Sequence, residues 1–436
     1  MAKAQNTQSK MWKRPFKNAG ILLLGRGTQG ILSLVYLALA ARTLGAAGFG
    51  NLVIIHSLVL TAAQLIRFQT WQAVMRYGDD ALKQNDIKTF QDINLFAVFL
   101  DFISAVICAG GLILFLNYCY GITGLQAEIE PLAKLYALGS IFVMLGSAPL
   151  GYLRLADRHD LIAIQTTVEP AIRFIGAIIL FFINGPLEAF LILWFAAMTA
   201  SRITLMVIAV RTMRKENLWS DFTVRPAKIL HPVSGIWRYV CGTQLTSTLN
   251  ITNGPIGTIL AGALLGAPAA GIFRVAQQFA DILIKPVNKL LVPAIYTDMT
   301  QSAGNRTILK DLSVKTALFA GAPSLGIFII LVAAGKVLIT ATVGTEYLGA
   351  YTPMIILALS GIAMVATFPL EPLLITAGKV RETALIRFLT VLIYFLGFLA
   401  LAPLFGITGA ATATAISTVC TALLFWLSGA LYLKEK

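Results

Sequence analysis

Long apolar runs follow one another along the whole of this 436-residue chain. A run of about 20 apolar residues can cross the hydrocarbon core of a bilayer as an α-helix. The pattern predicts twelve such spans, six in each half of the chain. They cover residues 19–41, 51–75, 94–117, 131–153, 161–183, 187–210, 235–264, 271–296, 314–334, 351–376, 383–403 and 408–431. The sequence therefore predicts an all-α integral membrane protein.

The pattern also repeats itself about every 221 residues. Leu44-Gly45-Ala46, with Gly50 after it, recurs as Leu265-Gly266-Ala267, with Gly271 after it. Further matches at offsets of 220 or 221 are Ser140 with Ser360, Pro149 with Pro369, Ala156 with Ala377 and Gly185 with Gly406. A near-constant offset close to half the chain length predicts two copies of one membrane unit, as in many secondary transporters.

The repeat and the span count together predict the domain organisation. We place an N-terminal six-helix bundle at residues 1–220 and a C-terminal six-helix bundle at residues 221–436, joined through the polar stretch 211–234. Because six spans return the chain to its starting side, both halves enter the membrane from the same side. They are then related by a pseudo-twofold axis along the membrane normal, with a central cavity between them.

Composition and charge agree with a membrane protein of defined orientation. Hydrophobic residues make up 57% of the chain and charged residues 12%, which is too little polar surface for a water-soluble fold. Lysine and arginine gather before the first span and after every second span, and this accounts for most of the net charge of +14. By the positive-inside rule both termini are cytoplasmic. The charge is therefore a topology signal and does not indicate nucleic-acid binding.

The sequence holds no motif of a familiar enzyme. Its four cysteines and three histidines show neither a disulfide framework nor a metal-ligand spacing. There is no phosphate-binding loop, HExxH or GxSxG pattern. The sequence therefore predicts no catalytic residue, no metal and no cofactor, and the protein is not expected to be an enzyme.

Polar residues form stripes at helical spacing on spans 1, 2, 7 and 8. The stripes include Arg26, Gln29 and Ser33, then Ser57, Gln64 and Arg67, then Ser247 and Asn250, then Gln278, Asp281 and Lys285. The offset of 221 takes Gln29 to Asn250 and Gln64 to Lys285. Equivalent faces are thus polar in both halves, which indicates a shared cavity. Helix packing explains small and hydroxyl residues equally well.

Charged residues inside the spans divide into two groups. Glu169 with Arg173, and Asp281 with Lys285, are each four residues apart and either neutralise one another or serve the cavity. Arg26 and Arg67 have no acidic residue at such a spacing. An arginine at the bilayer centre costs roughly 3 kcal/mol, so a cavity or an anionic partner is expected for these two.

These patterns give candidate site residues. The candidates for substrate binding are Arg26, Gln29, Gln64, Arg67, Arg173, Asn250, Gln278 and Lys285. The candidates for proton or cation coupling are Asp101, Glu169, Asp281 and Glu371, of which Asp101 and Glu371 are alternatively partners of the arginines. Guanidinium groups favour phosphate or carboxylate, so the cationic excess favours an anionic cargo.

Three short segments carry a resemblance to a known family. The segment 41–50 (ARTLGAAGFG), the segment 344–347 (GTEY) and the segment 406–411 (GITGAA) resemble the Wzx-type polysaccharide flippases. These belong to the multidrug/oligosaccharidyl-lipid/polysaccharide exporter superfamily. Proline is frequent in that family where Ala47 stands here, a departure that touches only loop geometry.

The resemblance implies a fold and a function. The fold is two six-helix bundles forming a V around a cationic cavity. The function is export of undecaprenyl-pyrophosphate-linked oligosaccharide units across the bacterial inner membrane by alternating access, for O-antigen, capsule or another surface polysaccharide. It further implies a proton or sodium gradient as the driving force, and membrane lipid and polysaccharide assembly proteins as partners.

Two other functions compete with the flippase. An ion-coupled multidrug or small-molecule antiporter of the same fold would rely on Asp101, Glu169 or Asp281. A membrane-bound polysaccharide polymerase is disfavoured because the outer loops, such as 118–130 and 335–350, are too short for an extracytoplasmic catalytic loop.

Overall fold

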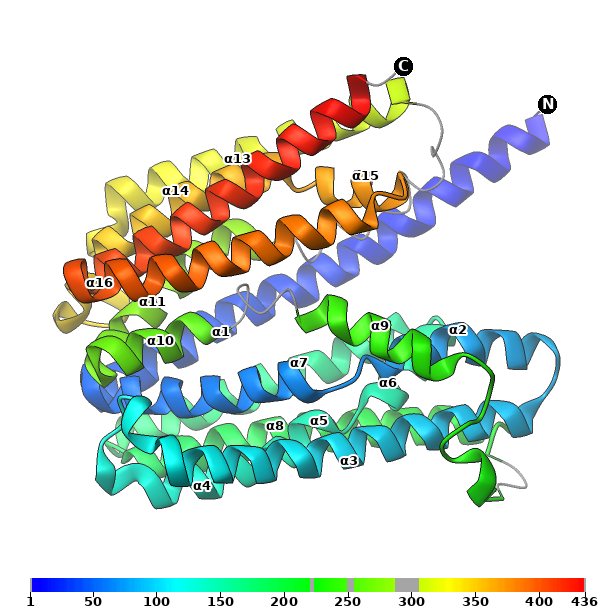
Figure 1. Cartoon of the computed structure of the whole chain (residues 1–436), viewed down its shortest axis with the longest axis horizontal. Coiled ribbons are helices and arrows are strands. Elements are labelled where there is room, and N and C mark those ends of the chain that lie inside the picture. Colours follow the sequence, from blue (N-terminus) through cyan, green and yellow to red (C-terminus); the bar gives the residue numbers. More distant parts are fainter. Residues whose placement is uncertain (1, 220–222, 249–254, 287–305, 435–436) are drawn as a thin grey trace.

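The computed structural model describes residues 2–219, 223–248, 255–286 and 306–434, and the secondary structure in these ranges is helical throughout (Figure 1). The first half contains α1 (Ala2–Ile66), α2 (Thr70–Lys83), α3 (Ile87–Cys119), α4 (Glu130–Leu138), α5 (Ser140–Met144), α6 (Ser147–Leu155), α7 (His159–Phe182) and α8 (Leu187–Lys215). The second half contains α9 (Ile236–Thr248), α10 (Ile256–Leu265), α11 (Ala267–Pro286), α13 (Arg306–Thr342), α14 (Tyr351–Thr367), α15 (Leu370–Thr376) and α16 (Val380–Lys434).

The predicted fold class is confirmed. Within the described ranges, eight helical stretches are long and apolar enough to cross a membrane. The longest elements, α1 and α16, each fold back on themselves at a glycine (Figure 1). α16 holds two predicted spans, and α1 holds the first predicted span and most of the second. Gly45 has a φ of 66° and Gly406 a φ of 60°. Glycine reaches such left-handed values without the steric penalty that a side chain imposes.

Three predicted spans are interrupted in the structure. The span 51–75 breaks between α1 and α2, the span 131–153 divides into α4, α5 and α6, and the span 351–376 divides into α14 and α15. A broken helix in a membrane leaves backbone groups that need other partners. At the first break, Gln244 Nε2 of α9 donates hydrogen bonds to the carbonyls of Gln64 (3.3 Å) and Leu65 (2.8 Å).

The sequence repeat is also a repeat of backbone conformation. Three pairs of residues at offsets of 220 or 221 share positive φ values. The pairs are Gly45 and Gly266 (66° and 86°), Gly124 and Gly344 (74° and 109°), and Asp157 and Gly378 (54° and 79°). The two halves therefore turn at equivalent points, as two copies of one unit should.

The equivalent glycines Gly50 and Gly271 face each other across the two halves. A Cβ atom on Gly50 would lie 1.8 Å from the carbonyl oxygen of Ala267. Reciprocally, a Cβ atom on Gly271 would lie 2.7 Å from the carbonyl oxygen of Ala46. Both helices carry a small residue four positions before the glycine, a spacing that lets helix backbones approach closely in membranes. This reciprocal contact is what a pseudo-twofold axis produces.

Polar contacts join the halves at the same end of the molecule, which we call the closed end and define by the turns at Gly45, Gly266 and Gly344. The Glu346 carboxylate accepts a hydrogen bond from the Ala46 amide at 2.9 Å. Arg42 donates to the Ala341 carbonyl at 2.6 Å, and the Tyr347 hydroxyl to the Ala41 carbonyl at 3.1 Å. The second arm of α1 thus begins against a loop of the other half.

The opposite end carries both chain termini, and we call it the termini end. Figure 1 shows the long helices α13, α14 and α16 nearer to α3, α7 and α8 at the closed end than towards the termini end. On one side α9 still joins the first half there, since Ile236 and Val240 pack into a cluster with Ala73, Phe96 and Leu100.

Candidate functional site

Two arginines of the first half, Arg67 and Arg202, have no direct partner among the described residues. Arg67 follows the last residue of α1 at the break before α2, and Arg202 lies within α8. Both are half-buried, and neither makes a hydrogen bond or an ion pair through its side chain in the described part of the chain. They repel each other electrostatically, and both are attracted by the carboxylate of Asp101. Arg202 is also attracted by the carboxylate of Glu169, which forms an ion pair with Arg173.

Arg202 owes its position to Gly146, which separates α5 from α6. Gly146 has a φ of 132°, a conformation that side chains rarely allow. A Cβ atom there would lie 3.6 Å from Arg202 Cδ and 3.8 Å from one of its guanidinium nitrogens. The arginine therefore packs against the backbone at the helix break.

Asp101 lies in α3 and is almost fully buried, with 2% of its surface exposed. It accepts a hydrogen bond from the Thr70 hydroxyl at 2.8 Å and another from the Ser147 amide at 2.9 Å. These donors are the first residues of α2 and α6. Two helix N-termini, each carrying partial positive charge, thus point to one carboxylate. The interruptions of two predicted spans create this site.

Removing the Asp101 carboxylate should destabilise the protein. In Asp101→Ala the Thr70 hydroxyl and the Ser147 amide lose their acceptor, at a cost of about 1–3 kcal/mol for each group left unsatisfied. Asp101→Asn keeps one acceptor oxygen and should lose less. Thermal unfolding in detergent measures both, with Asp80→Ala on the exposed face of α2 as the control. An Asp101→Ala protein as stable as the control would contradict this structural role.

Arg173 of α7 is neutralised locally. It forms the predicted ion pair with Glu169 at 2.7 Å, and only 4% of its side chain is exposed. Its guanidinium also donates to the Tyr36 hydroxyl at 3.3 Å and lies 4.5 Å from the ring centroid of Trp194. The local pairing predicted for these two residues is confirmed, so Arg173 adds less positive charge to a cavity than Arg67 or Arg202.

The contact between Tyr36 and Arg173 has an equivalent in the second half, made by residues of different chemistry. An offset of 221 takes Tyr36 to Gly257 and Arg173 to Tyr394. A Cβ atom on Gly257 would lie 2.6 Å from the hydroxyl of Tyr394, so the equivalent positions also touch in the second half. One half holds an arginine there and the other a buried tyrosine.

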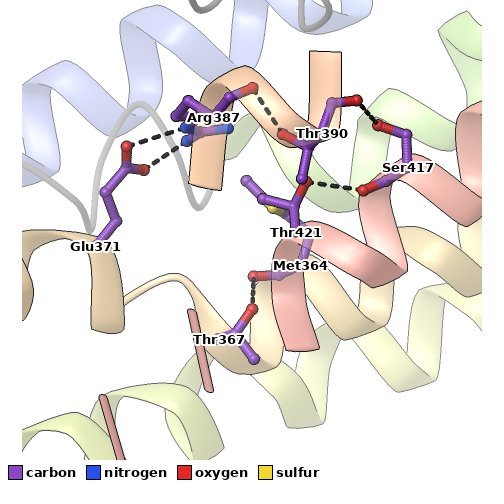
Figure 2. A network of polar contacts seen from close by, with 7 residues as sticks. All are labelled: Met364, Thr367, Glu371, Arg387, Thr390, Ser417 and Thr421. Atoms are coloured by element: carbon purple, nitrogen blue, oxygen red, sulfur yellow. Dashed lines mark hydrogen bonds and ion pairs between the residues drawn. The ribbon is translucent and has the colours of Figure 1, made fainter. Parts of the chain in front are cut away.

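The second half has its own polar network, in which each charged group is paired (Figure 2). Arg387 of α16 binds the carboxylate of Glu371 of α15 through two hydrogen bonds of 3.1 and 2.5 Å. Thr390 donates to the Arg387 carbonyl at 3.0 Å, and Ser417 donates to the Thr390 carbonyl at 2.9 Å. This network ties the two arms of α16 to each other and to α15, and Glu371 is therefore the partner of an arginine.

The remaining predicted site residues are described here by their burial or by their backbone alone. Gln278 is buried in α11, and Gln64 and Asp281 are half-buried. For Arg26, Gln29 and Lys285 only the helical backbone is described, and Asn250 lies outside the described residues. The shared cavity expected from the polar stripes of spans 1, 2, 7 and 8 therefore remains a prediction.

Sequence reasoning missed Arg202. The signal was the one used for Arg67, because Arg202 lies in the middle of the span 187–210 with no acidic residue three or four positions away. Arg67 and Arg202 carry two positive charges, whereas Asp101 carries one negative charge and already accepts two hydrogen bonds. In the described part of the chain no group of acidic, histidine and cysteine side chains has the arrangement of a metal site. The chemistry that this cluster favours is anion binding.

The fold matches those of known membrane transporters. It superposes with a TM-score of 0.70 on the inward-facing conformation of a multidrug resistance MATE family transporter of the MOP superfamily, at 14% identity over 93% of this chain and 94% of that one. It superposes equally well on the inward closed conformation of the lipid II flippase MurJ, with a TM-score of 0.70, 12% identity, and 93% and 87% of the two chains covered. At these identities the likeness shows the fold alone.

The sequence pattern of the polysaccharide biosynthesis protein family matches residues 16–296. The inner membrane protein YghQ of Escherichia coli (strain K12) is 30% identical over 321 residues, which cover 74% of this chain and 90% of YghQ. The chain therefore belongs to the polysaccharide biosynthesis protein family. This confirms the family resemblance expected from segments 41–50, 344–347 and 406–411.

Proposed function

We propose that this protein is a flippase that moves undecaprenyl-pyrophosphate-linked oligosaccharides across the bacterial inner membrane. The observation that carries the proposal is the pair Arg67 and Arg202, half-buried at helix breaks and without a direct carboxylate partner in the described residues. Two guanidinium groups match the donor geometry that a pyrophosphate requires. Membership of the polysaccharide biosynthesis family supports a sugar-bearing cargo.

Alternating access is the transport mechanism that this arrangement supports best. The contacts of Glu346, Arg42 and Tyr347 hold the halves together at the closed end. If the termini end faces the cytoplasm, the state described here receives its cargo from the cytoplasmic side. Opening at the closed end then requires these contacts to break while others form at the termini end.

Coupling to a proton or sodium gradient is part of the proposal. Asp101 is the strongest of the four coupling candidates, because its carboxylate interacts electrostatically with both Arg67 and Arg202. Neutralising Asp101 would remove a negative charge beside the two arginines, so the site would become more positive and bind an anion more strongly. Glu169 and Glu371 are held in ion pairs with Arg173 and Arg387.

The orientation can be tested by cysteine labelling in a background without the native cysteines. Cysteines at Asn85 and Asn217, exposed at the termini end, should resist a membrane-impermeant thiol reagent in intact cells. Cysteines at Ala127 and Thr345, exposed at the closed end, should react. All four should react after the cells are lysed. The reverse pattern in intact cells would place the termini outside and reverse the proposed direction of transport.

The activity can be tested in proteoliposomes with a labelled lipid-linked oligosaccharide. Movement of the pyrophosphate-linked form should exceed that of the same sugar on neutral undecaprenol by tenfold or more, the factor that corresponds to about 1.4 kcal/mol of binding. Equal rates for the two lipids would remove the basis for an anionic cargo. Proton-driven export of a cationic drug, without movement of either lipid, would instead identify an antiporter.

A further inference from the structure

A pocket at the termini end lies between α2 and α9, which come from the two halves of the repeat. Its volume is about 490 Å³, which falls in the range of small-ligand sites. Its lining residues are Arg76, Tyr77, Gly235, Arg238, Tyr239, Gly242 and Thr243. Two of them are arginines and none is acidic. The lining therefore carries positive charge from both halves.

Arg76 is held in place by aromatic rings and not by a carboxylate. Its guanidinium lies 5.5 Å from the ring centroid of Tyr77 and 4.9 Å from that of Tyr239. Such cation–π contacts use the face of the guanidinium and leave its N–H edges free to donate. Neither Arg76 nor Arg238 forms an ion pair within the described residues. The nearby Asp79 carboxylate is bound by Lys83 at 2.5 Å.

The surroundings of the pocket match the interface of a membrane. On one side is the apolar cluster of α2, α3 and α9 that includes Phe96 and Val240. On the other, α2 ends in exposed polar residues at Asp80 and Lys83. Aromatic residues with one polar edge gather between the two, as they do at the depth of lipid head groups. These aromatic residues are Tyr77, Trp237 and Tyr239, which pack against the cluster.

We propose that this pocket binds the head group of an anionic phospholipid, with its phosphate between Arg76 and Arg238. Basic pockets between membrane helices on the cytoplasmic side favour such head groups. The inference goes beyond the proposed function, because it concerns membrane lipid and not the transported cargo. Since the two arginines belong to different halves, a bound phosphate joins α2 to α9. It acts beside the hydrogen bonds that Gln244 already makes across this seam.

The proposal can be tested by native mass spectrometry of the full-length protein with defined lipids. Phosphatidylglycerol should remain bound at concentrations at which phosphatidylcholine does not. The double variant R76A/R238A should bind phosphatidylglycerol about tenfold more weakly, since it loses two charge-assisted contacts. The double variant R76K/R238K keeps the charge and should retain part of the binding. Arg211→Ala removes an exposed arginine of α8 that does not line the pocket, and it should bind as the unmodified protein does.

Two outcomes would contradict the proposal, and a third separates it from the proposed flippase function. Equal binding of phosphatidylglycerol by R76A/R238A and Arg211→Ala would remove the pocket as the site. Displacement of the lipid by millimolar inorganic phosphate would indicate a site for a soluble anion. Loss of lipid binding with unchanged transport of the oligosaccharide would leave the proposed flippase function intact.

Discussion

Arg67→Leu and Arg202→Leu proteins should reach the membrane in normal amounts and fail to export polysaccharide. Leucine removes the cost of placing an arginine within the bilayer, so insertion should be no worse than in the unmodified protein. The pyrophosphate of the cargo would lose a charge-assisted partner worth about 1.5–3 kcal/mol, which corresponds to a loss of tenfold or more. Surface polysaccharide in a deletion strain, normalised to membrane protein level, measures the effect.

Conservative and matched variants separate binding chemistry from helix packing. Arg67→Lys keeps the charge without the planar fork and should retain part of the activity. The same order should hold at Arg202, where the side chain packs against Gly146. Arg214→Leu changes an exposed arginine near the end of α8 and should leave export unchanged. If both leucine variants at Arg67 and Arg202 export normally, these arginines are structural and the anion-binding mechanism is wrong.

The second large effect is expected at the crossing of the two halves. Gly50→Ala places a Cβ atom 1.8 Å from the carbonyl oxygen of Ala267, so the helix backbones must separate. Overpacking in a tightly packed region costs typically 1–3 kcal/mol, and here the obstacle is backbone that cannot rotate away. The Gly50→Ala protein should therefore unfold at a clearly lower temperature in detergent and lose the closed-end contacts.

Alanine substitutions at two other glycines serve as comparisons for Gly50→Ala. Gly271→Ala places its Cβ atom 2.7 Å from the Ala46 carbonyl oxygen and should destabilise the protein less than Gly50→Ala. Gly110→Ala meets nothing within 4 Å in α3 and should leave stability unchanged or slightly raised. If Gly50→Ala is as stable as Gly110→Ala, the close approach of the two halves does not exist in the membrane.

Sequence patterns predicted the membrane spans and the repeat because both depend on local properties. A spanning helix satisfies its own backbone hydrogen bonds, so a run of apolar residues determines where it lies. The turns at Gly45 and Gly266 need backbone conformations that favour glycine, and the same glycines revealed the offset of 221. The pairing of Glu169 with Arg173 was also predictable, since four residues bring two side chains to one face of a helix.

Only the tertiary structure decided where the helices break and which charges meet. The run 51–75 is long enough to be read as one span, and its polar residues near Arg67 do not by themselves mark a break. The carbonyls freed at the break are satisfied by Gln244, about 180 residues away in sequence. Asp101 contacts Thr70 and Ser147 because α3 packs between two interrupted spans. Such contacts depend on how distant helices pack, and no periodicity within one helix records that. The sequence by itself therefore determined the spans, the repeat and the family, whereas packing between the helices decided the cluster of Arg67, Asp101 and Arg202.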